Sequence, residues 1–381
     1  MKILVSGASV AGPALAYWLH RHGFDCTVVE RATSLRDSGH AVDFRGEALA
    51  VLDRMGVLEA VRAHDTAMGD ATLIDREGRG YATLPAVIFA GELEILKGDL
   101  TRILHQATQE FTEYVFGDSI AVLEQSADGV RVTFDSGRVR DFDLVVGADG
   151  LHSNTRGLVF GREDRFVRHL GIYSAIFSTD NYLGLKNTGW LYSVPDRAVN
   201  IFSARDSTEV RVALHFASGP LEYNRHDVTE HKRIVAEHFA GTGWEVPGLL
   251  RAMAAADDVY FAANAQVVMD RWHDGRVVLL GDAGYCAAPT SGRGTSQALI
   301  GAYVLAGELA AADGRHTEAF AAYEREMRGF VDEHQRVGRE WAQRYFIDSL
   351  TQETIDAAVA AATQGGTDEL VTLREYSLAD R

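Results

Sequence analysis

The chain opens with an apolar run, a helical pattern and a second apolar run. Residues 1–6 are apolar at nearly every position, as expected of a strand buried on both faces of a sheet. From Pro13 to His20 the apolar positions recur at helical spacing, and the next apolar stretch runs from Phe24 to Glu30. This order predicts a βαβ unit with two parallel strands.

Between residues 40 and 150 the pattern alternates between helical and strand periodicity. The predicted elements are a helix at 47–64, a strand excursion at 71–92, a helix at 99–108, a β-meander at 119–134 and a buried strand at 143–150.

Residues 165–265 differ in character from the flanking segments. Apolar and polar positions alternate there, which predicts antiparallel strands with one half-exposed face. An apolar strand follows at 277–280, a small-residue helix is predicted from Gly294 to Ala312, and we expect helices from there to the end of the chain. The pattern as a whole predicts an α/β fold in which a parallel sheet is interrupted by an antiparallel one.

The turn after the first strand carries a dinucleotide fingerprint. Gly7, Ser9 and Gly12 occupy the three positions of a Gly-x-Gly-x-x-Gly motif, with serine as a small replacement for the second glycine. A pyrophosphate would lie against the helix N-terminus, where free N–H groups favour anions. Glu30 ends the second strand eighteen residues after Gly12, where it would accept hydrogen bonds from the ribose hydroxyls.

A second signal lies some 270 residues downstream. Gly281 and Asp282 follow the apolar strand at 277–280, and Pro289 precedes a helix that opens at Gly292 and Gly294. A carboxylate at the end of a buried strand is costly unless it accepts hydrogen bonds, for which ribityl hydroxyls are suitable donors. Nucleotide motifs at both ends of a long chain indicate FAD, whose adenine and flavin ends need separate binding groups.

The nucleotide-binding domain is therefore predicted to be discontinuous. We assign residues 1–70, 93–164 and 266–324 to a Rossmann-like FAD-binding domain. Residues 71–92 and 165–265 form the predicted substrate domain, and residues 325–381 a C-terminal helical segment that either closes the pocket or forms a dimer contact.

Composition favours a cytoplasmic enzyme that acts on a small molecule. The net charge of −17 argues against nucleic acid or an anionic membrane as a partner, and no apolar run reaches transmembrane length. We expect no signal peptide, and Cys26 and Cys286 have no spacing for a metal site or a disulfide framework. Monomer and homodimer both remain open.

These motifs resemble the single-component FAD-dependent monooxygenases of the para-hydroxybenzoate hydroxylase fold, and among them the tetracycline-inactivating monooxygenases most of all. The resemblance covers roughly residues 1–330 and includes a third motif, Asp149-Gly150, with Arg156 to brace it. It implies non-covalent FAD, NADPH or NADH as the reductant, and O2 as co-substrate. It also implies hydroxylation of a hydrophobic aromatic or polyketide-like molecule through a C4a-hydroperoxyflavin.

The resemblance further implies a set of cofactor-binding residues. Asp43 matches a position near the isoalloxazine ring, Arg36 one that meets the NADPH phosphate, and Lys97 one that is often arginine. The cofactor-binding candidates are Gly7, Ser9, Val10, Ala11, Gly12, Glu30, Arg31, Arg36, Asp43, Lys97, Asp149, Gly150, Arg156, Asp282, Pro289, Gly292, Gly294 and Thr295.

The chemistry that the resemblance implies needs few side chains, since the cofactor carries it. We name no catalytic acid or base, and Tyr285 stands where many relatives have histidine. Tyr192, Phe202 and His215 on the interrupting sheet are candidates to line the substrate pocket. Baeyer–Villiger oxygen insertion on the same scaffold stays an alternative, as does a flavoprotein that keeps FAD as a structural element, such as a cyclase or a binding module.

Overall fold

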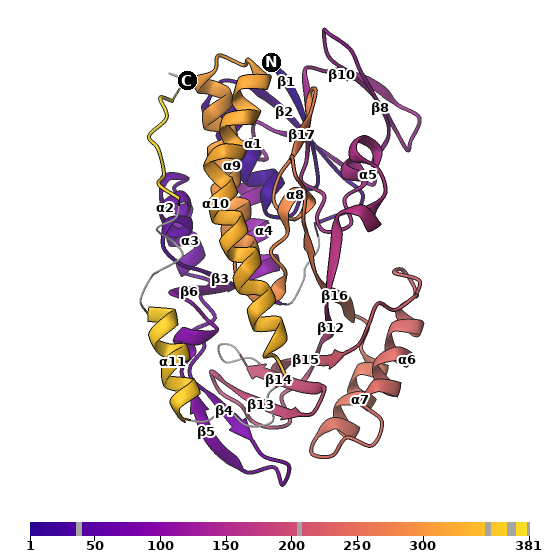
Figure 1. The fold of residues 1–381 in the computed structure, drawn as a ribbon, viewed down its shortest axis with the longest axis vertical. Helices are drawn as coiled ribbons and strands as arrows, with labels where there is room; N and C mark the ends of the chain where they lie inside the picture. Colours follow the sequence, from indigo (N-terminus) through magenta and orange to yellow (C-terminus); the bar gives the residue numbers. More distant parts are fainter. Residues whose placement is uncertain (36–39, 204–207, 347–351, 364–370, 379–381) are drawn as a thin grey trace.

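The computed structural model describes residues 1–35, 40–203, 208–346, 352–363 and 371–378. Figure 1 shows an elongated molecule with a parallel sheet near one end, an antiparallel sheet near the other, and two long helices running between them.

The parallel sheet is built from strands that lie far apart in the sequence. It has six strands, in the order β17 (His273–Asp274), β18 (Val277–Leu279), β11 (Leu144–Gly147), β1 (Lys2–Ser6), β2 (Asp25–Glu30) and β7 (Glu113–Phe116). All neighbours pair in parallel except the edge strand β17.

Strand register brings several turns to one edge of this sheet. Ser6 at the end of β1 is level with Gly147 of β11 and with Val29 of β2, and Gly147 is level with Leu279 of β18. The turns that follow these four strands therefore lie side by side. Ligands bind at this carboxyl edge in open parallel sheets.

Helices from both halves of the chain pack on the sheet and on one another. They are α1 (Ala11–Arg21), α2 (Glu47–Arg54), α3 (Leu58–Arg62), α4 (Lys97–Gln106), α5 (Asn154–Phe160), α8 (Asp282–Tyr285) and α9 (Gly294–Ala311). The small, mostly apolar residues of α9 allow it to be buried between α1, α2 and α10 (His316–Gln343). The single helix predicted at 47–64 is wrong, because Gly56 adopts a positive φ of 72° and separates α2 from α3.

Two small sheets complete this end of the molecule. Strands β8 (Ile120–Gln125), β9 (Val130–Phe134) and β10 (Val139–Phe142) form the predicted meander. Strands β3 (Ala41–Phe44) and β6 (Leu93–Leu96) form an antiparallel pair that packs against α9 and α4.

The antiparallel sheet combines the two segments assigned to the substrate domain. Its seven strands are β16 (Tyr260–Val267), β12 (Val167–Asp180), β15 (Glu209–Ala217), β14 (Arg197–Ser203), β13 (Thr188–Val194), β4 (Ala71–Ile74) and β5 (Gly80–Leu84), in that order. The short helix η1 (Ala86–Ile88) leads back toward β6.

One face of this sheet is covered by two helices that the strand pattern did not predict. The helices α6 (Val228–His238) and α7 (Val246–Ala255) bury Val235 and Leu249 against Val212 and Leu214 of β15. The interpretation of residues 165–265 as strands alone is therefore wrong for the segment between β15 and β16.

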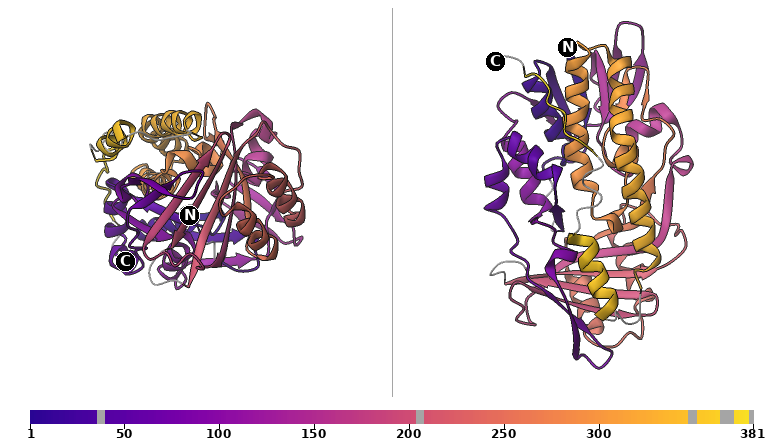
Figure 2. Two further views of the ribbon diagram at one scale, coloured as in Figure 1. Left: turned by 90° about the horizontal axis from the view of Figure 1, so that it is seen from below. Right: turned by 60° about the vertical axis from the view of Figure 1, so that its left-hand side comes forward.

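The C-terminal segment spans the whole length of the molecule. Helix α10 runs beside α9 toward the antiparallel sheet, and α11 (Gln352–Thr363) contacts η1 (Figure 2). Residues 371–378 then return to α9 without helical structure, so the expectation of helices to the end of the chain is wrong there. The ring of Tyr376 lies over Gly307, where a Cβ atom would come within 2.3 Å of it.

The observed architecture confirms the predicted fold class, an α/β fold with a Rossmann-like sheet, an interrupting antiparallel sheet and C-terminal helices. The exact domain boundaries stay a proposal, supported by which strands share a sheet. Among the described residues, no helix has both the length and the apolar character needed to cross a membrane.

Candidate functional site

The turn between β1 and α1 is so tightly packed that only glycine fits at two positions. A Cβ atom on Gly12 would lie 1.9 Å from the carbonyl oxygen of Gly7, and one on Gly7 would lie 2.4 Å from that of Ala148. Ser9 is exposed, which explains why a side chain is tolerated there. Val10 caps α1 without a side-chain hydrogen bond, so the first N–H groups of the helix face the carboxyl edge.

Glu30 closes this turn from the next strand. Its carboxylate accepts hydrogen bonds from the backbone N–H of Ala8 (2.9 Å) and of Ala32 (2.9 Å). Glu30 therefore orders the glycine turn, and each of its oxygens retains a lone pair for a further donor. Arg31 is exposed beside it, and Arg36 lies outside the described residues.

Asp149 organises the turn after β11. Its carboxylate accepts hydrogen bonds from the Ser153 hydroxyl at 2.5 Å and from the Thr155 N–H and hydroxyl at 2.9 Å each. Gly150 follows with a positive φ of 80°. The side chain of Asp149 is thus used to shape the turn, and the backbone of Gly150 is left at the edge.

Arg156 joins this turn to the turn after β18. The guanidinium is fully buried and donates to the carbonyl oxygens of Leu151 (2.8 Å) and Ala283 (2.9 Å). Glu163 lies 3.5 Å away and supplies a negative charge. Although burial opposes it, hydrogen bonds from His152 and Arg225 lower the pKa of Glu163 to about 2, so this carboxylate stays ionised.

The turn after β18 brings the C-terminal half of the chain to the same edge. Gly281 has a positive φ of 64°, and Asp282 begins α8 directly after it. A Cβ atom on Gly294 would lie 3.6 Å from Asp282 Oδ1, and one on Gly292 would lie 3.7 Å from Asp43 Oδ1. The carboxylates of Asp43 and Asp282 therefore both lie next to the glycine turn that opens α9.

The N-terminus of α9 has no side-chain cap. Arg293 is its N-cap residue and makes no side-chain capping hydrogen bond, and Thr295 in the first turn is half-buried. Pro289, in the short helix η3 (Pro289–Ser291), is exposed just before this turn. The first N–H groups of an 18-residue helix favour negative charge or a carbonyl oxygen.

Comparison with known proteins assigns this arrangement to a family. A family model described as FAD binding domain matches residues 1–336. A flavin-dependent monooxygenase of Legionella longbeachae is 38% identical over 359 residues, which cover 93% of this chain and 92% of that protein. This chain belongs to the family of FAD-dependent monooxygenases.

Solved structures agree with this assignment. The crystal structure of tetracycline destructase Tet(55) matches with a TM-score of 0.90 and 37% identity, over 98% of both chains. That of tetracycline destructase Tet(51) matches with a TM-score of 0.89 and 35% identity, over 99% of both chains. The resemblance inferred from the sequence motifs is thereby confirmed.

The monooxygenase also has buried polar atoms near these turns that sequence reasoning missed. Among the described residues, Ser296 Oγ and Gln297 Nε2 in the first turns of α9 are buried without a hydrogen-bond partner. Asn264 Oδ1 of β16 is unpartnered as well, while its Nδ2 donates to the Thr290 hydroxyl beside Pro289. A signal for Ser296 and Gln297 is present in the sequence. Both residues follow Gly292 and Gly294 in the first turns of the predicted helix, where a ligand is expected.

Lys97 and Tyr285 lie in different environments. Lys97 is half-buried at the first position of α4, and its N–H donates to the carbonyl oxygen of His40. Tyr285 is buried in the core with its hydroxyl 2.7 Å from that of Tyr323, and burial raises its pKa to about 12. The Tyr285 ring therefore packs inside the monooxygenase.

The three candidate substrate residues do not share one face of the antiparallel sheet. Tyr192 lies on the face covered by α6 and α7 and stacks on Trp244 with ring centroids 4.9 Å apart. Phe202 and His215 lie on the opposite face, toward the end of α10, where the ring of Tyr345 contacts His215. Of the three, only Phe202 and His215 therefore share a face, four positions apart along the strands.

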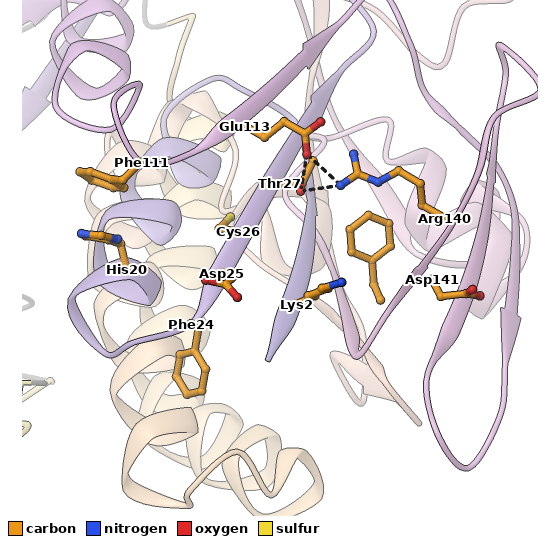
Figure 3. A pocket seen from close by; sticks show the side chains of 11 residues that line it. Lys2, His20, Phe24, Asp25, Cys26, Thr27, Phe111, Glu113, Arg140 and Asp141 are labelled. Carbon is orange, nitrogen blue, oxygen red and sulfur yellow. Dashed lines mark hydrogen bonds and ion pairs between the residues drawn. The ribbon is translucent and has the colours of Figure 1, made fainter. Parts of the chain in front are cut away.

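A separate hollow of about 710 Å³ opens at the amino ends of β1 and β2, where Lys2 and Asp25 begin the two strands (Figure 3). It is polar and shallow, and Arg140 donates to Glu113 inside it at 2.8 Å. This hollow lies at the edge of the sheet opposite to the glycine turns. Because it lies away from the glycine turns, we assign it no part in the reaction.

Proposed function

We propose that this monooxygenase holds FAD along the carboxyl edge of its parallel sheet and transfers one oxygen atom from O2 to a hydrophobic aromatic or polyketide-like molecule. NADPH or NADH would supply the electrons. The observation that carries the proposal is the approach of Asp43 to Gly292 and of Asp282 to Gly294, at the start of α9, which has no side-chain cap. This approach joins the two ends of the chain at one ligand site.

The residues at this edge fit FAD. The glycine turn at residues 7–12 would hold the pyrophosphate, Glu30 the adenosine ribose and Asp282 the ribityl hydroxyls. The N–H groups at the start of α9 would face the pyrimidine side of the flavin ring, where negative charge gathers on reduction. When bound, FAD supplies the electron transfer and the activation of oxygen.

The flavin-side face of the antiparallel sheet would bind the substrate. Ring centroids of Phe202 and Phe89 lie 5.8 Å apart, which gives this face apolar surface. His215 Nδ1 is hydrogen-bonded to the Ser174 hydroxyl at 2.8 Å, and burial lowers the pKa of His215 to about 4. His215 Nε2 lies 3.3 Å from Asn200 Nδ2, so the neutral imidazole is held from both nitrogens and would shape this face of the pocket.

The reductant would approach the turn at Asp149 and Gly150. Asp149 is held by three hydrogen bonds from Ser153 and Thr155, so it fixes the shape of the turn and leaves backbone groups of Gly150 for a dinucleotide.

Glu30→Ala should weaken FAD binding about tenfold and leave the protein folded. The variant loses the acceptor for two backbone N–H groups of the glycine turn and for the ribose hydroxyls, a loss of about 1.4 kcal/mol in binding. Fluorescence titration of the apoprotein with FAD measures this, with the exposed Asp332→Ala on α10 as the control. Wild-type affinity in Glu30→Ala would show that Glu30 serves only the turn.

The function itself is tested by isotope labelling. The holoenzyme is given NADPH or NADH under 18O2 with tetracycline as the first probe, since two similar structures are tetracycline destructases. A product that carries one 18O atom, formed with one equivalent of reductant, is expected. Reductant use that yields only hydrogen peroxide, with tetracycline and with a panel of phenolic polyketides, would contradict the proposal. NMR of the product separates a new hydroxyl group from an oxygen inserted into the carbon skeleton.

A further inference from the structure

Two acidic residues are cross-strand neighbours on the small β3–β6 sheet. Asp43 of β3 is directly opposite Glu94 of β6 in the antiparallel register. Directly opposite residues share a face and have Cβ atoms about 4.5–5.5 Å apart, and like charges in such a pair are destabilising. Both side chains are largely buried, so water cannot screen a second charge well.

Asp43 has cationic neighbours. Arg45 Nε lies 3.3 Å from Asp43 Oδ2, and their side chains are 12% and 16% exposed, respectively. Burial raises the pKa of Asp43, and the nearby positive charges of Arg45 and Arg293 oppose that shift. Asp43 Oδ1 also lies close to Gly292. Of the two acidic residues, Asp43 is therefore the one next to the cations and to the glycine turn that opens α9.

Glu94 has a different environment. Its Oε1 accepts a 2.5 Å hydrogen bond from the hydroxyl of buried Thr66. Burial raises the pKa of Glu94 to about 7. The Thr66 hydrogen bond opposes this shift, and the negative charges of Asp43 and Asp65 act in the same direction as burial. Among the described groups that shift the pKa of Glu94, none is a cation.

Two more titratable groups lie at one end of the β3–β6 sheet. His40 precedes β3 and Lys97 follows β6, and the Lys97 N–H donates to the His40 carbonyl oxygen. Burial and the charge of Lys97 lower the pKa of His40 to about 4. His40 is therefore neutral throughout the range in which Glu94 titrates, so it does not produce a titration near pH 7.

We propose that Asp43 and Glu94 share a single proton beside the flavin ring, with Asp43 ionised and Glu94 neutral. Glu94 is then a positioning residue that sets the negative charge which the pair presents to the flavin. The inference rests on the proposed FAD site for the identity of the ligand, but the proton-sharing pair can be tested without FAD.

The sign of the pH dependence follows from the direction of the Glu94 shift. A carboxyl group with a raised pKa keeps its proton in the folded protein at pH values where the unfolded chain has lost it. The favourable neutral state is therefore present at pH 6 and is lost as the pH rises through about 7. Above that range the pair carries two negative charges.

The first experiment uses the apoprotein and infrared difference spectra between pH 5 and 9. The carbonyl band of a protonated carboxylic acid should be present at pH 6 in the wild type, disappear as the pH rises through about 7, and be missing in Glu94→Gln. In Asp43→Asn the band should disappear at lower pH, since the neighbouring charge is gone. A wild type with no band at pH 6, or an Asp43→Asn variant with an unmoved midpoint, would overturn the pair.

The second experiment measures the midpoint potential of bound FAD against pH. A reduced flavin is anionic, so ionised Glu94 should disfavour it by about tenfold, which is about 30 mV for a two-electron couple. We expect Glu94→Gln to match the wild type at pH 6 and to have the higher potential at pH 8.5. The matched control is Glu326→Gln on the exposed face of α10, which should follow the wild type at both pH values.

The two experiments separate two kinds of failure. If the infrared titration is as expected but FAD binds to none of these proteins, the FAD site is wrong and the pair stands. If FAD binds and the potentials of wild type and Glu94→Gln stay parallel from pH 6 to 8.5, the pair does not act on the flavin, and its role beside the ring is overturned.

Discussion

Replacing Arg156 by methionine is expected to lower the free energy of unfolding by about 2–4 kcal/mol and to weaken FAD binding at the same time. Methionine fills much of the volume but leaves the carbonyl oxygens of Leu151 and Ala283 without their charged donor. Glu163 keeps Arg225 and His152 as partners, which limits the loss. The variant also removes the buried Arg156 Nε, which has no acceptor, and this offsets part of the cost.

FAD binding should suffer because Arg156 connects two ligand-binding turns. Leu151 follows Gly150, and Ala283 follows Asp282, so the guanidinium fixes the distance between the turns. Urea unfolding of the apoprotein and FAD titration measure the two effects, with the exposed Arg162→Met as the control. If Arg156→Met and Arg162→Met unfold at the same urea concentration, the hydrogen bonds of Arg156 to the two turns contribute nothing to stability. Arg156→Lys should be intermediate, since it keeps the charge but cannot reach both carbonyl groups.

The local signals in the sequence predicted the glycine turns and the parallel sheet because those features depend on neighbours in the chain. Gly12 is required by its contact with Gly7 within one turn, and Glu30 by its place at the end of the next strand. The close approach of Gly7 to Ala148, by contrast, depends on the distant strand β11. The pattern failed at α6 and α7. There, α6 is mostly polar and α7 begins with Val246-Pro-Gly, a sequence that also suits a loop.

The interactions that complete the candidate site are long-range and could not be found from spacing. Glu94 becomes notable only when β6 pairs with β3 and brings it opposite Asp43. Tyr192 and His215 both occur in alternating strands, but only the register shows that they lie on opposite faces of the sheet. Likewise the C-terminal residues 371–378 follow the surface of α9 because Gly307 leaves room for the ring of Tyr376.

Asp282→Ala should raise the FAD dissociation constant by about tenfold to a hundredfold. A hydrogen bond to a charged acceptor contributes about 1.5–3 kcal/mol, and alanine removes the carboxylate that would accept from the ribityl hydroxyls. The apoprotein should keep its unfolding free energy, because the half-buried Asp282 side chain makes no capping hydrogen bond to α8. Burial and, after it, the negative charge of Asp282 and a hydrogen bond to its side chain raise the pKa of Cys286. Alanine removes that weak hydrogen bond, but the thiol stays neutral and still donates to the carbonyl oxygen of Ala265.

This separation distinguishes Asp282 from Arg156. Arg156→Met should change both stability and FAD affinity, because the Arg156 side chain joins two turns. Asp282→Ala should change FAD affinity alone, because the Asp282 side chain would face the ligand. Asp282→Asn keeps an acceptor without the charge and should lose less affinity than alanine does, and Asp332→Ala on the exposed side of α10 should lose none. If Asp282→Ala binds FAD as tightly as the wild type, Asp282 does not contact the ribityl chain. The flavin would then lie nearer to Asp43 at the start of α9.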